Sequence, residues 1–263
     1  MTKYFVILFL FFLNISLHGK NHDRIFIEKN SKQLEEKEAI LILPGFGSKL
    51  QGTKKIADYF FNKGFDIYIP DFLSRDSISD CVTNLDKFII KHKLSRYKSI
   101  HVFSYIIGAW TINSWITKNP NNNIATIIYD RSPLQERAPY TVVKDIPLIG
   151  WLLFGNLVKN LISSEYPPIQ NGKIDIGIII ENKATKFISK HRKTMFILGP
   201  VNWDASNLKQ EYDDKIYTVL NHDQMYKRFD IIGEEIFNFI RKKKFTETAK
   251  REPYTEDPFI KFE

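Results

Sequence analysis

The stretch that decides the fold is SIHVFSYIIGAW, residues 99–110. Its first part, Ser99–Phe103, is an apolar run rich in β-branched residues, which is typical of a buried strand. Its second part leads into a segment with Trp110, Ile112 and Trp115 at helical spacing, and that segment ends at Asn119–Pro120. A sharp turn therefore joins a buried strand directly to a helix.

The same alternation of strand and helix recurs on both sides of this stretch. Further apolar strands are predicted at residues 39–43, 65–69, 124–129, 174–180 and 216–220. Helices are predicted from an N-cap at Thr53 to Gly64, from about Ser79, and across Phe229–Ile240. Short connections between such elements predict an α/β fold, with a doubly wound, mostly parallel sheet covered on both faces.

Composition narrows the classes of function. The chain has 263 residues, 43% of them hydrophobic, so it can bury a sizeable core. Its single cysteine, Cys81, excludes an internal disulfide and a CxxC zinc site and is predicted to be a small core residue. The net charge of +8 is dispersed over helix faces and the tail, which argues against nucleic-acid binding. No nucleotide-, zinc- or calcium-binding motif occurs, so neither a cofactor nor a metal is expected.

The N-terminus has the pattern of an export signal. MTKYFVILFLFFL, residues 1–13, is a short basic end followed by an apolar run too short to span a bilayer. Residues 1–19 are predicted to be a signal peptide, residues 20–245 the folded domain and residues 246–263 a charged, solvated tail. The protein is expected to be periplasmic or secreted, or held at a membrane if the segment is not cleaved.

An insertion interrupts the alternation at about residues 131–172. It contains IPLIGWLLFGNLV, residues 146–158, which carries no charge and is apolar around its whole circumference. Three interpretations remain open for this segment: a pair of core helices, a lid or interfacial segment over a pocket at the carboxyl edge of the sheet, and a partner interface.

Three segments resemble the α/β-hydrolase superfamily, in particular its esterases and lipases, over residues 39–241. LPGFG (43–47) is similar to the family's oxyanion turn, NHDQM (221–225) to its histidine loop, and residues 102–110 lie where the nucleophile elbow belongs. The resemblance implies an oxyanion site at Phe46 and Gly47, a general base at His222, and a pocket that includes Ile106 and Ile107.

The elbow departs from the family pattern Gly-x-Ser-x-Gly. Aligned without gaps on Gly108, the pattern places Ile106 at the nucleophile position, where the side chain has no lone pair. Other registers place Tyr105 or Ser104 there, but the first loses the glycine match. The second puts the β-branched Ile106 where the turn needs glycine.

The acid that would orient His222 is also open. The resemblance implies an acid between the last two strands, where Asp204 is the carboxylate of residues 199–206 and Asn202 has an equally suitable offset. Asp130, at the end of a predicted strand, is a third alternative.

The leading hypothesis is an exported, non-catalytic protein of α/β-hydrolase type that binds an apolar or acyl-containing small molecule or a partner. Membrane-surface contact is a further expectation. A third hypothesis, of a different class, is a surface-associated scaffold that uses the apolar insertion to bind a partner. The rival hypothesis is an active carboxylic-ester hydrolase, with Ser104 as nucleophile, His222 as base and Asp204 as acid.

Overall fold

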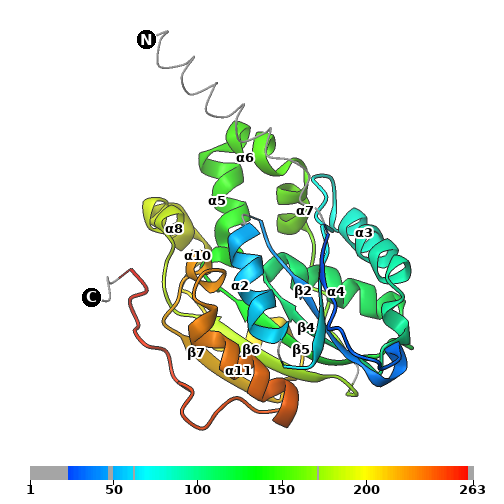
Figure 1. Cartoon of the computed structure of the whole chain (residues 1–263). Coiled ribbons are helices and arrows are strands. Elements are labelled where there is room, and N and C mark those ends of the chain that lie inside the picture. The colour runs from blue at the N-terminus through cyan, green and yellow to red at the C-terminus, as the bar shows by residue number, and fades with distance from the viewer. Residues whose placement is uncertain (1–22, 47–49, 62, 171, 260–263) are drawn as a thin grey trace.

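The computed structural model describes residues 23–46, 50–61, 63–170 and 172–259 (Figure 1). The predicted signal peptide, residues 1–19, and the predicted oxyanion residue Gly47 therefore lie outside the described residues. In the described part of the chain, no helix is long and apolar enough to cross a membrane.

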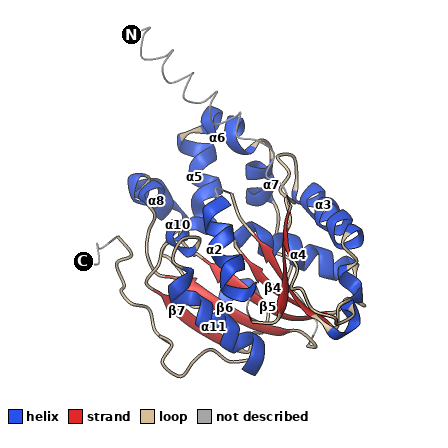
Figure 2. Cartoon of the chain, viewed as in Figure 1, coloured by secondary structure: helices blue, strands red, loops and turns tan. Residues whose placement is uncertain are grey.

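A sheet of seven strands forms the centre of the molecule (Figure 2). Its order is β1-β3-β2-β4-β5-β6-β7, and every pair is parallel except the antiparallel pair of β1 and β3. The strands are β1 Arg24–Phe26, β2 Glu38–Leu43, β3 Phe65–Ile69, β4 Ser99–Ser104, β5 Ile124–Arg131, β6 Asp175–Glu181 and β7 Asp214–Thr218. The predicted α/β fold with a mostly parallel sheet is confirmed.

Helices follow the strands and cover both faces of the sheet. The α-helices are α2 Leu50–Phe61, α3 Ile78–Lys91, α4 Ile106–Lys118, α5 Ala138–Asp145, α6 Pro147–Phe154, α7 Leu157–Ser163, α8 Lys186–Lys190, α9 Arg192–Met195, α10 His222–Met225 and α11 Phe229–Lys242. Short 3₁₀ turns are η1 Leu34–Glu36, η2 Leu94–Arg96, η3 Gln135–Arg137, η4 Phe196–Leu198 and η5 Ser206–Leu208.

Each face of the sheet has its own hydrophobic core. On one face, α2 and α11 pack with residues such as Ile56, Phe60 and Ile236 against inward side chains of the strands. On the other face, α3 and α4 pack with residues such as Leu85 and Ile112. Burying each such side chain is worth about 1.5–3 kcal/mol, which explains why the central strands are apolar on both sides.

The parallel register brings the carboxyl ends of β2, β4, β5 and β6 to one edge. Leu43 pairs with Ser104, and Ser104 pairs with Tyr129. One strand further, Arg131 pairs with Ile180. The residues that follow these strands therefore meet at the same edge although they lie far apart in the sequence.

The insertion after β5 forms η3, α5, α6 and α7 beyond this carboxyl edge (Figure 1). Its helix α6 does not form a core helix pair, because Leu148, Trp151 and Leu152 are 70%, 52% and 47% exposed. The opposite side of α6 does face the protein: Gly150 is buried against Val142 of α5. The core-pair interpretation of this segment is therefore wrong for α6.

Two elements at the start of the domain differ from the sequence prediction. The strand β1 was not predicted, because three residues among charged neighbours carry no clear periodicity and pair on one side only. Helix α2 begins at Leu50, before the predicted N-cap Thr53. Gly52 lies inside this helix, and a Cβ there would lie 2.8 Å from the Tyr226 carbonyl oxygen, so close packing explains that glycine.

Residues after α11 lie against the domain instead of extending as a solvated tail. The amide of Tyr217 in β7 donates to the Lys250 carbonyl at 2.8 Å, and the amide of Ala184 donates to the Pro258 carbonyl at 2.9 Å. Asn182 exchanges hydrogen bonds with the backbone of Thr255. The contact with Lys250 pairs a backbone amide on the free edge of β7, and the other two hold the chain end against the segment that follows β6.

Candidate functional site

The elbow sits at the junction of β4 and α4. Tyr105 is the N-cap residue of α4 and Ile106 its first residue. A Cβ on Gly108 would lie only 2.5 Å from the Leu43 carbonyl oxygen, so this position requires glycine. In the pattern Gly-x-Ser-x-Gly the last glycine follows the nucleophile by two residues, and Ile106 stands two residues before Gly108.

Ser104 lies one step before the turn, inside β4. Its side chain is fully buried, and its hydroxyl has no hydrogen-bond partner among the described residues. Ser104 lines neither of the two cavities that contain Ile106. This position does not favour Ser104 as a nucleophile, because an attacking hydroxyl must reach both the substrate and the base.

Tyr105 is buried in an aromatic cluster beneath the turn. Its ring stacks on Tyr226 at 4.0 Å between centroids and meets His222 edge-on at 6.1 Å. The Tyr226 hydroxyl accepts a hydrogen bond of 2.9 Å from the Gly45 amide. Desolvation by burial raises the pKa of both phenols well above their ordinary value, so both stay neutral.

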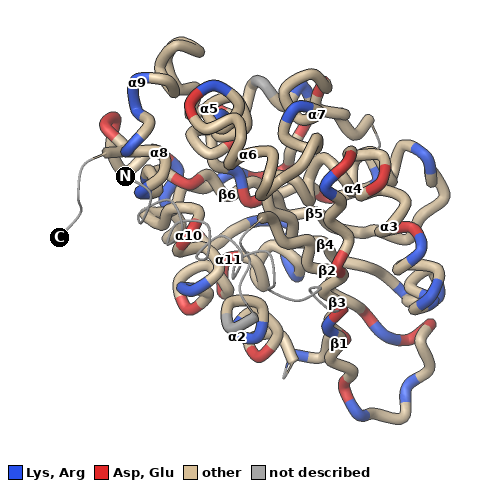
Figure 3. Tube along the Cα trace, turned by 90° about the horizontal axis from the view of Figure 1, so that it is seen from above, with Lys and Arg blue, Asp and Glu red and all other residues tan. Residues whose placement is uncertain are grey.

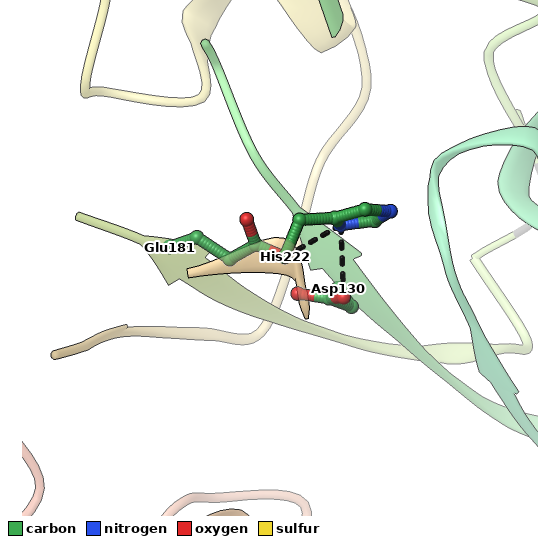
Figure 4. A group of neighbouring side chains, drawn as sticks. All are labelled: Asp130, Glu181 and His222. Atoms are coloured by element: carbon green, nitrogen blue, oxygen red, sulfur yellow. Dashed lines mark hydrogen bonds and ion pairs between the residues drawn. The ribbon is translucent and has the colours of Figure 1, made fainter. Parts of the chain in front are cut away.

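His222 is the first residue of α10, directly after the strand β7 and its connecting turn. Asn221 caps α10 through the Gln224 amide, which holds the start of the helix in place. The imidazole Nδ1 lies 2.7 Å from Glu181 Oε1 and 3.9 Å from Asp130 Oδ2 (Figure 4). A Cβ on Gly45 would lie 3.8 Å from Nε2, so the other ring nitrogen faces the Gly45–Phe46 turn.

The two carboxyl groups beside His222 are almost fully buried. Burial raises the pKa of Glu181 to about 8, and burial together with the charge of Glu181 raises the pKa of Asp130 well above its usual range. Burial also lowers the pKa of His222, so the imidazole is neutral at pH 7. The pair of acids therefore holds a proton at neutral pH instead of two negative charges.

Asp130, Glu181 and His222 could also hold a divalent metal ion. One ligand atom from each of Asp130, Glu181 and His222 lies within 4.8 Å of the others. Two carboxylates and an imidazole suit a divalent cation such as Mn²⁺ or Zn²⁺. Protons bound by the two acids also reduce the negative charge of the cluster, and the expectation that no metal binds stays a prediction.

The predicted acid Asp204 lies elsewhere. Asp204 is exposed; it accepts a hydrogen bond of 2.8 Å from the Ser206 amide, and its own amide donates to Asn202. The partner of His222 in the structure is Glu181, with Asp130 beside it. The segment from residue 182 to 213 carries α8, α9, η4 and η5 before β7 begins, so residues 199–206 are not held beside His222.

A signal for Glu181 is present in the sequence. Glu181 is the first carboxylate after the apolar run 174–180, at the carboxyl end of a predicted strand. The family resemblance implies an acid in the loop at residues 199–206, whereas the acid that contacts His222 is Glu181 at the end of β6. Asp130, the third alternative, does lie close to His222.

Two cavities meet at Ile106. The first, of about 310 Å³, is almost entirely apolar and extends under α6. It is lined by Gly45, Phe46, Ile106, Ile107, Gln135, Ala138, Pro139, Val142, Ile146, Leu153, Phe154, Val158, Leu161, Phe187 and His222. The second, of about 430 Å³, is more polar and includes Asp130, Arg137 and Asn202. Both share Ile106, Pro139 and Leu161.

The apolar cavity offers no nucleophile among the described residues. Its lining contains no Ser, Thr, Cys, Lys, Asp or Glu, and His222 is its one titratable side chain. Phe46, a predicted oxyanion residue, lines it, and its ring packs edge-on against Phe154 of α6 at 4.9 Å. This contact links the turn after β2 to the insertion.

Comparison with known proteins shows similarity at the level of structure. No protein-family model matches the sequence, and no curated protein matches it. The structure is similar to Est1E from Butyrivibrio proteoclasticus (TM-score 0.53, 11% identity, 84% of this chain and 93% of the other). It is similar to juvenile hormone epoxide hydrolase from the silkworm Bombyx mori (0.57, 10%, 84% and 73%). It also resembles an alpha/beta hydrolase fold protein from Chitinophaga pinensis (0.54, 10%, 84% and 93%).

Proposed function

Given that this chain has the α/β-hydrolase fold, we propose that it is a non-catalytic member that binds an apolar, acyl-type ligand in the cavity beside Ile106. The observation that carries the proposal is the place of Ile106 at the start of α4, two residues before the glycine that the elbow requires. An isoleucine side chain can neither attack a carbonyl nor give a proton to His222.

The rest of the site supports binding. The cavity of about 310 Å³ falls in the range of small-molecule pockets, and its lining is aliphatic and aromatic. His222, Gln135 and the backbone of the Gly45–Phe46 turn supply the few polar groups of the lining. Such a pocket favours a ligand with a hydrocarbon chain and a small polar head.

A fluorophosphonate probe tests the absence of a nucleophile. We expect no labelling of the unmodified protein, and labelling of Ile106→Ser that is lost again when His222→Ala is added. Ile107→Ser is the matched control, because Ile107 lines the same cavity but does not occupy the nucleophile position. Circular dichroism of each variant establishes that it is folded.

The rival serine hydrolase makes the opposite prediction. Stoichiometric labelling of the unmodified protein that disappears in Ser104→Ala would refute the non-catalytic proposal. Binding is measured separately, by mass spectrometry of lipids extracted from the purified protein and by displacement of a fluorescent fatty acid. If the purified protein carries no lipid and does not bind the fluorescent fatty acid, the proposed acyl-type ligand is wrong.

Export belongs to the same proposal and is supported by the segment MTKYFVILFLFFL at residues 1–13. N-terminal sequencing of the protein from an exporting host tests it, with cleavage expected close to residue 19. An intact Met1 together with a cytoplasmic location of the chain would contradict export.

A further inference from the structure

We propose that the outer side of α6 docks on an anionic phospholipid surface. The surface consists of Leu148, Trp151 and Leu152, here called the α6 face, together with the basic segment 183–193 beside it. Docking itself does not depend on the proposed ligand. The additional step, in which an apolar ligand passes from the lipid into the cavity, rests on the proposed function.

Exposed apolar side chains are concentrated on α6. Thirteen large apolar side chains of the described residues are exposed, and three of them lie within five residues of this one helix. Leu148 at 70% is the most exposed of all thirteen. A soluble surface rarely gathers such residues on so few turns of helix without a binding partner.

The α6 helix is held firmly while it presents this face. Arg75 donates hydrogen bonds to the carbonyls of Trp151 and Leu152, at 3.1 and 2.6 Å, and so caps the end of the helix. A Cβ on Gly155 would lie 2.3 Å from the Arg75 carbonyl oxygen, so the chain turns tightly there. The exposed side chains therefore project from a fixed helix and not from a loose loop.

Positive charge lies next to the α6 face. Residues 182–203 contain Lys183, Lys186, Lys190, Arg192 and Lys193 but no Asp or Glu. The segment adjoins the start of α6, because His191 Nδ1 lies 2.7 Å from Asp145 Oδ2, two residues before Pro147 (Figure 3 shows the basic residues of α9 in blue). The acidic groups close to this surface include Asp145, which His191 and Thr194 contact, and the buried Glu181, two residues before Lys183. Asp257 also lies close, because the carbonyl of the next residue, Pro258, accepts a hydrogen bond from the Ala184 amide.

This combination fits a lipid surface better than a protein partner. A Trp with leucines inserts at the boundary between headgroups and acyl chains, and neighbouring Lys and Arg residues attract anionic headgroups. The inner side of the same helix lines the apolar cavity through Leu153 and Phe154. One helix therefore contacts both the proposed lipid surface and the pocket.

Vesicle flotation with the full chain tests the proposal. We expect binding to vesicles of phosphatidylcholine with phosphatidylglycerol, at least tenfold weaker binding to phosphatidylcholine alone, and a decrease with salt. Leu148→Asp with Trp151→Asp should reduce binding to the anionic vesicles at least tenfold. Ile90→Asp on α3 is the matched control, since Ile90 is 67% exposed and lies outside this surface, and it should bind like the unmodified protein.

Tryptophan fluorescence separates docking through α6 from binding through the N-terminal segment, which contains no Trp. Brominated lipids should quench the unmodified protein, and Trp151→Phe should still float but lose most of that quenching. The proposal would be overturned if brominated lipids caused no quenching, or if Leu148→Asp with Trp151→Asp floated like the unmodified protein. It would also be overturned if Ile90→Asp lost as much vesicle binding as that double variant. If light scattering shows a dimer that Leu148→Asp with Trp151→Asp converts to a monomer, the α6 face binds a second copy of the chain instead. None of these results depends on fluorophosphonate labelling, so the two proposals fail separately.

Discussion

Nδ1 of His222 lies 2.7 Å from Oε1 of Glu181, so the imidazole has a buried acid partner. A buried His–carboxyl pair orients the ring and selects its tautomer. Under the proposed function, the pair is a fixed polar group at one end of an apolar cavity. The following predictions test the contacts that hold it.

Stability should depend on the proton that Glu181 binds. Burial raises the pKa of Glu181 from 4.5 to about 8, so the folded state binds this proton more tightly than the unfolded state. Its contribution is full below about pH 4.5 and is lost as pH rises through about 8. The free energy of unfolding of the unmodified protein, relative to Glu181→Gln, should fall by up to about 1.4 kcal/mol per pH unit in that window.

The lowered pKa of His222 acts in the opposite direction, because stability from a neutral buried imidazole is lost as pH falls below 6.5. The unmodified protein and Glu181→Gln both retain His222, so the difference between them reports on the acid pair of Glu181 and Asp130. Urea unfolding at half-unit steps of pH measures it. A difference that does not change between pH 4.5 and 8 would show that Glu181 is ionised throughout.

Removal of divalent cations should leave the melting temperature unchanged, because Asp130 and Glu181 both have raised pKa values and bound protons reduce their negative charge. Thermal unfolding before and after dialysis against a chelator measures this. The opposite result is specific: a fall in melting temperature that Zn²⁺ or Mn²⁺ reverses, and that Asp130→Asn abolishes, would identify a metal site at Asp130, Glu181 and His222.

Gly108→Ala should destabilise the protein by about 1–3 kcal/mol, because the new Cβ would lie 2.5 Å from a backbone oxygen of Leu43. Gly172→Ala is the matched control: no atom lies within 4 Å of a Cβ placed there, and the change should stay within about 0.5 kcal/mol. Chemical denaturation of both variants compares them. Equal stability of the two would mean that the elbow does not pack against β2 in this way.

Tyr226→Phe should cost about 1–3 kcal/mol, because the buried Gly45 amide loses its hydrogen-bond acceptor. Tyr59→Phe removes a hydroxyl that bonds Glu234 at the surface and should change stability by about 0.5 kcal/mol or less. Hydrogen exchange at the Gly45 amide gives a second readout, with faster exchange expected only in the first variant. Unchanged exchange there would contradict the contact.

Local patterns in the sequence were sufficient for the strands and helices that alternate regularly. The apolar run at residues 99–103 is the core of β4, and the distance from Ile106 to Gly108 sets the register of the elbow. The sequence also shows that His222 lies in the connection between the last strand and the helix that follows it. Each of these features depends on residues only a few positions apart, which is the range that periodicity and turn chemistry report.

Only the tertiary structure decided which acid meets His222 and which side of α6 is exposed. The parallel pairing of β5 with β6 brings Asp130 and Glu181 to one edge of the sheet, and the return of the chain through β7 brings His222 to them. Asp204 carries the same chemistry in the sequence, but its loop lies away from that edge. Helix α6 is apolar all round, so its sequence contains no amphipathic pattern, and its packing beside α5 and over the cavity leaves Leu148, Trp151 and Leu152 exposed.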